Sequence, residues 1–279
     1  MLYLGCPVWA NPQWKNLIYN SKLEPSEFLA NYSRYFNSVE GNTSFYADPS
    51  PQTVQRWAEQ SSDNFRFTLK VPKRLTHQFK QFQIEELQRW MDLIAPLANK
   101  IALVHVQLPA AFSPLDLSWL QQMLNTLCSS FSVAVEVRHP GFFDKAEHEI
   151  TLNRLLRHFD TERVIFDSRA LFSVQPTTSA LQDAQRKKPY LPVHAVALTK
   201  TPMLRFVGTD DMAINQQYYR PWLAKVRQWL DEGKTPFCFF HSPDNFTAPI
   251  LARQFVIDLG IDHPILAPWP QAQTQLSLL

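Results

Sequence analysis

The sequence has little glycine, little cysteine and almost no net charge, and each shortage narrows the possible functions. Its three cysteines, Cys6, Cys128 and Cys238, lie far apart and form no C-x-x-C pair. This spacing excludes a disulfide framework and a thiolate zinc site, and it indicates a reducing compartment. The net charge is only +2 over 279 residues, so the composition as a whole gives no reason to expect a nucleic-acid or membrane partner.

Sequence motifs of several well-known enzyme classes are also lacking. The chain has only six glycines, with no G-x-G-x-x-G after the first expected strand and no Walker, H-E-x-x-H, EF-hand or G-x-S-x-G motif. A dinucleotide-binding sheet would therefore lack its phosphate loop. The first residues do not resemble a signal peptide and no apolar run reaches the ~20 residues of a membrane span, so we expect a cytoplasmic protein without a membrane partner.

What the chain does have is a regular alternation of strand and helix patterns. Apolar residues make up 45% of it and charged residues 19%, which fits a globular protein with a sizeable core. Strands are expected at residues 2–6, 66–71, 101–108, 133–137, 163–166, 203–207 and 237–240. Helices are expected at residues 25–35, 50–57, 84–97, 115–127, 146–159, 215–230 and 248–259.

The stretches between these elements are less regular. Residues 38–40 are too short to assign alone, and residues 41–46 have the composition of a turn-forming loop. Residues 173–202 are polar and rich in proline, which predicts a long surface excursion with at most a short helix and with the basic residues 186–188 in solvent. The residues from 264 onward form a proline-rich tail that we expect to wrap the surface.

About eight strands, nearly all followed by a helix, give the pattern of parallel βα units. Eight such units predict a closed (β/α)8 barrel of the TIM type, built by residues 1–279 as a single domain. A doubly wound open sheet is the alternative. Active sites of such barrels lie where the strands end, at the carboxyl face, so the strand ends are the candidate site.

The strand at residues 133–137 and the turn that follows it carry the leading candidate residues. Valines at alternate positions give this strand one apolar face, and Glu136 and Arg138 share the other. His139 and Pro140 then end the strand. An isolated ionised carboxylate in a core is costly, so Glu136 requires a charged partner, a solvated cavity or a ligand.

Nearly every other strand also presents polar groups close to its carboxyl end. A barrel that needed only packing would fill these positions with Val, Ile and Leu. The polar members of the alternating pairs are Glu40 and Asn42, Thr68 and Lys70, His105 and Gln107, Asp167 and Arg169, Arg205, and His241.

This polar set allows several interpretations. The charges can neutralise one another in a purely structural ion network. A divalent metal is not favoured, because the carboxylates and histidines lack diagnostic spacing and because Lys70, Arg138 and Arg205 would repel a cation. The same three cations suit an anionic ligand such as a phosphate or carboxylate. Nearby aromatic residues can stack on a ring or pack against neighbouring loops, namely Trp9, Trp14, Phe45 and Tyr46.

The sequence resembles the YecE-like family, also called domain of unknown function 72, and the resemblance runs along most of the chain. It implies a TIM-type barrel but no settled activity, and likeness of scaffold to other barrel enzymes does not transfer function. The motifs that carry it are residues 40–46 (EGNTSFY), residues 65–72 with Thr76 and His77, Gln107-Leu108-Pro109 with Phe112, residues 136–140 (EVRHP) and residues 239–248.

Our first hypothesis, from these residues and from the family resemblance, is a hydrolase or lyase. Its substrate would be phosphorylated or sugar-like, and DNA is one candidate substrate. Glu136 would be the general acid or base, Glu40 or Asp167 the second carboxylate and His139 an alternate, with no cofactor required. The expected substrate-binding residues are Lys70, Arg138 and Arg205 for an anionic group, Asn42 and Gln107 for orientation, Trp9 and Tyr46 for stacking, and His241 and Asn245 at the last strand end.

A second hypothesis is a non-catalytic protein that binds nucleic acid or another anionic ligand. In this reading the basic cluster of residues 70–80 contacts phosphates and the rim aromatics stack on bases. A third is a structural barrel whose buried ion network serves stability alone.

Overall fold

A computed structural model describes residues 1–81 and 83–270 of the chain. Its strands form two parallel sheets, one ordered β1-β9-β8-β7 and the other β2-β3-β4-β5-β6. The first sheet contains β1 (Tyr3–Gly5), β7 (Ile165–Asp167), β8 (Met203–Val207) and β9 (Phe237–His241). The second contains β2 (Ser38–Gly41), β3 (Arg66–Lys70), β4 (Ile101–Gln107), β5 (Val133–Glu136) and β6 (Glu162–Arg163).

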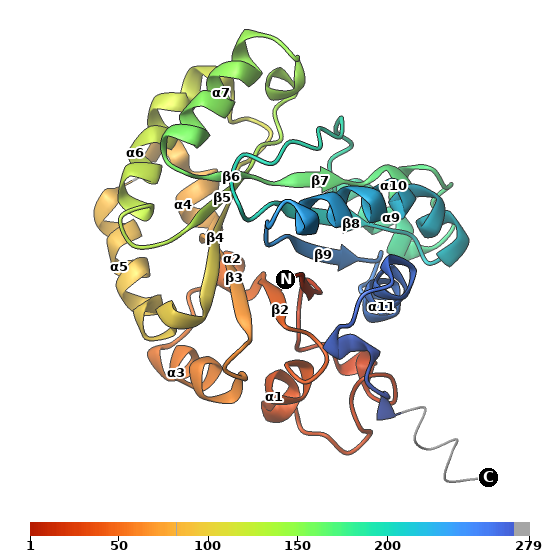
Figure 1. Cartoon of the computed structure of the whole chain (residues 1–279). Helices are drawn as coiled ribbons and strands as arrows, with labels where there is room; N and C mark the ends of the chain where they lie inside the picture. The colour runs from red at the N-terminus through yellow and green to blue at the C-terminus, as the bar shows by residue number, and fades with distance from the viewer. Residues whose placement is uncertain (82, 271–279) are drawn as a thin grey trace, which may run out of the picture.

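Helices lie around the outside of the strands (Figure 1). No helix within residues 1–81 and 83–270 is long and apolar enough to cross a membrane. The longer helices are α3 (Pro51–Gln60), α5 (Ile84–Ile94), α6 (Leu117–Leu127), α7 (Glu147–His158), α9 (Ser179–Lys187), α10 (Met212–Asp231) and α11 (Ala248–Leu259). Short helices of about one turn are α1 (Phe28–Tyr32), α2 (Thr43–Tyr46), α4 (Lys73–His77) and α8 (Arg169–Phe172).

The alternation of parallel strands and helices is confirmed, and helix starts follow the capping chemistry of the sequence. Ser50 caps α3 by accepting a hydrogen bond from the Thr53 amide, and Pro51 occupies the first helical position. Asp211 caps α10 in the same way, so this helix starts three residues before the expected residue 215. The last predicted helix, residues 248–259, has the bounds of α11.

Two expectations require correction, and the structure assigns one stretch that the sequence left open. Residues 41–46 are not a loop throughout, because Thr43–Tyr46 form the turn α2. Residues 38–40 belong to β2, which pairs with β3 and is stabilised by a neighbour that the local sequence does not show. The strand expected at 163–166 is divided between β6 and β7, which pair with different sheets.

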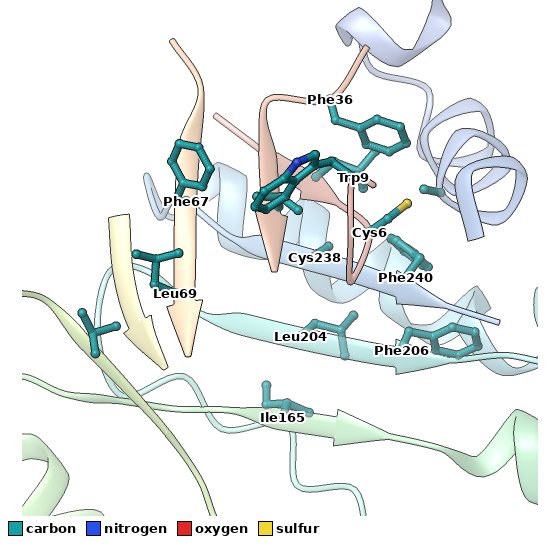
Figure 2. Packing of buried hydrophobic residues seen from close by; sticks show 14 of the residues in the cluster. Cys6, Trp9, Phe36, Phe67, Leu69, Ile165, Leu204, Phe206, Cys238 and Phe240 are labelled. Carbon is teal, nitrogen blue, oxygen red and sulfur yellow. The ribbon is translucent and has the colours of Figure 1, made fainter. Parts of the chain in front are cut away.

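Alternate residues of each strand face opposite sides of the sheet, and one side forms the main apolar core. On β8, Leu204 and Phe206 pack outward toward the helices, and Cys238 and Phe240 do the same on β9 (Figure 2). The residue between the first pair, Arg205, therefore points to the opposite face of the sheet. This inner face carries the polar strand ends.

Below the polar strand ends, the inner face is apolar. A separate buried cluster contains residues of β4, β5, β8 and β9 together with Val164, which lies between β6 and β7. Its members are Leu103, Ala134, Val164, Met203, Phe237 and Phe239, with Tyr3 and Ala102 packed against them. The strand period places His105, Glu136, Arg205 and His241 two residues further along these strands. The apolar cluster thus forms the floor under the charged groups.

Residues 173–202 contain the helix α9. Polar contacts with Glu162 and Glu149 hold this segment against the rest of the protein. The Glu162 carboxylate accepts hydrogen bonds from the amides of Leu198 and Thr199 at 2.9 and 3.0 Å. Glu149 on α7 binds His194 Nδ1 at 2.7 Å. The excursion is therefore anchored at two points, and it leads one end of α9 toward the carboxyl ends of the strands.

The proline-rich tail packs against α11 over the part that the structure describes. The Arg253 guanidinium donates hydrogen bonds to the carbonyls of Ile265, Leu266 and Ala267. Its cation also lies 4.7 Å from the centre of the Trp269 ring. The rest of the predicted tail, residues 271–279, lies outside the described residues.

Candidate functional site

Arg205 on β8 binds two buried carboxylates, Glu40 on β2 and Glu136 on β5. Its Nε and Nη2 each donate to Glu40 at 2.8 Å, which is a bidentate contact, and its Nη1 donates to Glu136. All three side chains are nearly inaccessible, with 1% or less exposed. The guanidinium therefore neutralises charges that β2, β5 and β8 bring to one point.

Two further groups surround the Glu40 carboxylate. Lys70 Nζ lies 2.8 Å from Glu40 Oε1 and donates a second hydrogen bond, also of 2.8 Å, to Gln107 Oε1. His241 Nε2 lies 2.9 Å from Glu40 Oε2. Since a carboxylate only accepts hydrogen bonds, this distance assigns the proton of the imidazole to Nε2.

Glu136 has its own set of partners on the other side of Arg205. Arg138 Nε and Nη2 approach Glu136 Oε1 at 2.8 and 2.7 Å. His105 Nε2 lies 3.4 Å from Glu136 Oε2, at the limit of a hydrogen bond. Each carboxylate thus has at least two cationic or imidazole neighbours, as a buried carboxylate requires.

The proton affinities of this cluster follow from burial and from the neighbouring charges. Burial alone would raise the carboxyl pKa values, but Arg205 and the other cations hold the pKa of both Glu40 and Glu136 well below the usual range. Burial together with the charge of Arg205 lowers the pKa of Lys70 to about 7. Burial lowers the pKa of His105 to about 4 and of His241 to about 3, so both imidazoles are neutral near neutral pH.

A pocket of about 400 Å³ opens above this cluster at the carboxyl ends of the strands, and we refer to it as the mouth pocket. Its walls include apolar, aromatic and amide groups, but no Asp or Glu among the described residues lines it. Six cationic side chains do so: Lys70, Lys73, Arg138, Lys187, Lys188 and Arg205. Because Glu40 and Glu136 are buried, bind Arg205 and do not line the pocket, a ligand in the pocket meets mainly positive charge.

Lys187 and Lys188 line this pocket without a signal in the sequence, and Lys188 is the more buried of the two. The expectation that residues 186–188 are solvated is wrong for Lys188, which is half-buried and lines the mouth pocket at the end of α9. Burial and the nearby charge of Arg205 lower its pKa to about 8. A basic run in a polar excursion carries no local signal of this position, because the anchors at Glu149 and Glu162 decide where the excursion lies.

Most of the predicted binding residues meet in the same pocket. Lys70, Gln107, Arg138, Arg205 and His241 line it together with Asn42, Tyr46 and Asn245. Asn42 Nδ2 donates to the Pro7 carbonyl at 2.8 Å, which fixes the amide at the rim. Tyr46 is 79% exposed, so its ring is free to contact a ligand at the pocket edge.

Three predicted site residues lie elsewhere. Asp167 is fully buried, but its carboxylate accepts hydrogen bonds from Arg169 and from Trp222 Nε1 on α10, toward the helices. His139 Nδ1 accepts a hydrogen bond from the Gly141 amide and caps the turn after β5. Trp9 is only 8% exposed and packs edge-to-face on Trp57, so it belongs to the core.

Among residues 1–81 and 83–270, no group of three or more His, Cys, Asp or Glu side chains has a geometry that could hold a metal ion. The Glu40 and Glu136 carboxylates bind Arg205. Their oxygens are thus already engaged by fixed cations.

A second depression of about 440 Å³ adjoins the mouth pocket. The two share Phe45, Tyr46, Lys73 and His77 in their walls. Burial and the charge of Arg138 lower the pKa of His77 to about 4, so this shared imidazole is neutral near neutral pH. The shared wall allows one ligand to extend from the cationic mouth into a more neutral, aromatic groove.

Comparison with known proteins supplies the family. A family model described as "Protein of unknown function DUF72" matches residues 3–274. The chain belongs to the DUF72 family. The UPF0759 protein YecE of Escherichia coli K12 is 42% identical over 279 residues, with 100% of both chains covered. The UPF0759 protein YunF of Bacillus subtilis 168 is 26% identical over 287 residues, covering 96% of this chain and 98% of that protein.

Solved DUF72 structures share the α/β architecture. A DUF72 family protein from Enterococcus faecalis V583 superposes with a TM-score of 0.73 at 16% identity, covering 94% of this chain and 97% of that one. A DUF72 family protein from Thermotoga maritima MSB8 gives a TM-score of 0.72 at 21% identity, covering 94% and 100%. At these identities the likeness concerns the fold, and the function must be argued from the site.

Proposed function

We propose that the protein binds a small ligand carrying a phosphate monoester in the mouth pocket. The observation that carries this proposal is the excess of positive charge around the two carboxylates. Four cations converge at the inner pocket, Lys70, Arg138, Lys188 and Arg205, against the two carboxylates Glu40 and Glu136. A phosphate monoester carries close to two negative charges at neutral pH and would balance this excess.

The carboxylates in this proposal position the cations and do not act as bases. Glu136 and Glu40 have pKa values held well below the usual range by Arg205, so neither takes up a proton readily near neutral pH. Their ion pairs instead fix the guanidinium of Arg205 and the amine of Lys70 before any ligand arrives. Preorganised donors of this kind bind an anion without a further ordering cost.

A small ligand is favoured over a nucleic acid by the placement of the basic cluster at residues 70–80. Lys70 is only 3% exposed and lies inside the pocket. Arg74 already binds Asp48 and Glu86 at 2.7 and 2.9 Å. The cluster therefore does not form the open row of free cations that follows a phosphate backbone.

We further propose that the described residues form one domain, a closed (β/α)8 barrel. In this barrel β1 lies beside β2, and β6 continues into β7. The Glu40 amide donates to the Cys6 carbonyl at 3.0 Å, across the gap between the two sheets. A Cβ on Gly5 would lie 2.3 Å from the Ser38 carbonyl oxygen, so this glycine permits the close approach of β1 to β2. Only Val164 separates β6 from β7.

Titration calorimetry with inorganic phosphate, ribose 5-phosphate and ribose tests the proposed function. We expect both phosphates to bind and ribose not to bind. Arg138→Met should weaken phosphate binding by roughly tenfold or more, because a charge-assisted contact is lost. Arg89→Met, at a side chain that is 69% exposed, is the matched control.

Two outcomes would contradict this function. Equal heats for ribose and ribose 5-phosphate would show that the phosphate is not recognised. Tight binding of a single-stranded oligonucleotide with a steep loss of affinity in salt, without phosphate binding, would favour the nucleic-acid reading instead.

A further inference from the structure

The mouth pocket contains an amine whose position differs from that of the other lysines in its wall. Lys70 is 3% exposed, lies at the end of β3 and is fixed by Glu40 and Gln107 at 2.8 Å each. Lys73 and Lys187 line the same pocket but are exposed to solvent. An immobilised, desolvated amine at the bottom of a cationic pocket is the arrangement that favours covalent chemistry with a carbonyl.

We propose that Lys70 condenses with the carbonyl group of a phosphorylated aldehyde or ketone to form an imine. This inference rests on the proposed phosphate-binding function of the mouth pocket. Arg138, Arg205 and Lys188 would bind the phosphate, which places the remainder of the ligand within the same enclosed space as Nζ.

The surroundings of Lys70 supply the neutral amine that the reaction needs. Burial and the charge of Arg205 lower its pKa to about 7, so near neutral pH a large share of the molecules carries a free electron pair on Nζ. The proton that the ammonium group releases passes to the carbonyl oxygen, while the Glu40 carboxylate, 2.8 Å from Nζ, stays ionised and orients the amine. Gln107 Oε1 holds the amine from a second direction and limits its rotation.

The condensation balances without any further reactant. The electron pair of Nζ forms a bond to the carbonyl carbon while the carbonyl oxygen takes up a proton, and the resulting carbinolamine loses that oxygen as water. The sum is one ammonium group and one carbonyl group giving one protonated imine and one water, with no oxidation or reduction.

The protonated imine also fits the charge pattern of the site. It keeps one positive charge at Nζ, so the ion pair with Glu40 survives the reaction. A cationic imine withdraws electrons from the adjacent carbon–carbon bond and from the adjacent C–H bond. The substrate class is therefore a phosphorylated carbonyl compound that undergoes carbon–carbon cleavage or proton transfer, which specifies the lyase branch of the sequence-based hypothesis.

Reductive trapping tests this assignment on the full chain. The protein is incubated with glyceraldehyde 3-phosphate or with glyceraldehyde, reduced with borohydride, and mapped by peptide mass spectrometry. We expect a secondary-amine adduct at Lys70 that is roughly tenfold more abundant with the phosphorylated aldehyde. Lys70→Arg should remove this adduct, and Lys80→Arg, at an exposed residue outside the pocket wall, should retain it.

The possible results separate this inference from the function on which it rests. Phosphate binding by calorimetry, with adducts only on exposed lysines or equally with both aldehydes, would overturn the imine and leave the binding function intact. If the wild-type protein did not bind phosphate, both the imine and the phosphate-binding function would be overturned. A Lys70→Arg protein that still binds phosphate and retains its melting temperature, but forms no adduct in the mapped peptide, would support the assignment.

Discussion

Arg205 binds Glu40 through two parallel hydrogen bonds of 2.8 Å, although the two residues are 165 positions apart in the sequence. The same guanidinium reaches Glu136 through its remaining nitrogen. One side chain therefore ties three strands together at the inner face. The contact combines two roles, since it stabilises buried carboxylates and presents a fixed cation to the mouth pocket.

Replacing Arg205 with Met should be strongly destabilising. The substitution leaves Glu40 and Glu136 buried with fewer cations, and breaking a buried pair in this way costs about 3–5 kcal/mol. Urea unfolding monitored by circular dichroism measures this loss in the free energy of unfolding. The control is Arg74→Met, since Arg74 is 40% exposed and its pairs contribute about 0–1 kcal/mol. Equal losses for the two variants would show that the buried cluster has no special part in stability.

Replacing Lys188 with Met should weaken phosphate binding without destabilising the fold. Lys188 lines the mouth pocket, and no carboxylate within residues 1–81 and 83–270 forms a short ion pair with it, so a roughly tenfold loss of affinity with an unchanged melting temperature is expected. Arg186→Met, two residues away on α9, is the matched control, because its side chain is 76% exposed and pairs with Asp183. If the two variants bound phosphate equally, Lys188 would have no part in the site.

Sulfate binding should weaken as the pH rises. Sulfate remains doubly negative across the range, so any change in its affinity reports on the protein. The charge of Lys70 is lost as the pH passes about 7 and that of Lys188 as it passes about 8, and we expect affinity to fall between these values and beyond. Calorimetry from about pH 6 to about pH 9 measures the fall. Lys70→Arg should flatten the lower part of the curve, since arginine stays charged; a curve of unchanged shape would exclude Lys70 from titration there.

Stability should decrease on acidification below about pH 6.5. Burial lowers the pKa of His105 to about 4 and of His241 to about 3, so the unfolded chain takes up protons at these histidines that the folded chain excludes. The free energy of unfolding therefore falls as the pH drops from about 6.5 toward about 4, by up to ~1.4 kcal/mol per pH unit for each histidine. Below pH 4.5 the lowered pKa values of Glu40 and Glu136 act in the same direction.

His105→Gln separates this histidine from the other acid-sensitive groups. Denaturant unfolding at several pH values should show a shallower decline for the variant than for the wild type. His148→Gln is the comparison, since its side chain is 58% exposed. An identical pH dependence in the wild type and His105→Gln would mean that His105 does not oppose protonation in the folded state.

The sequence predicted where the candidate site lies better than it predicted which side chains contact one another there. Alternation with period two put Glu40, Lys70, Glu136 and Arg205 on one face near the strand ends, because this period is a property of the strand backbone itself. It also placed Asp167 there, but the structure turns this carboxylate toward Trp222 on α10. Val164 belongs to the inner apolar cluster and Phe166 contacts the Arg205 guanidinium, so the same alternation turns Asp167 to the helix side of the sheet.

Aromatic residues show the same limit. The sequence predicted both Trp9 and Tyr46 to lie at the rim of the site, yet Trp9 is 8% exposed and Tyr46 is 79% exposed. The difference arises from Trp57 and Phe67, which provide Trp9 with edge-to-face contacts in the core. Contacts between distant segments decide burial, and composition alone cannot rank two aromatic side chains in neighbouring loops.

By itself the sequence determined the alternation of parallel strands and helices, the family and the polar character of the strand ends. These follow from local backbone periods, capping residues and short motifs, all of which are written in consecutive residues. The tertiary structure decided which charges meet: it placed Arg205 between Glu40 and Glu136 and brought Lys188 over the pocket. Electrostatic energy depends on distances in space, and those distances arise only when strand order and the anchored excursion are fixed.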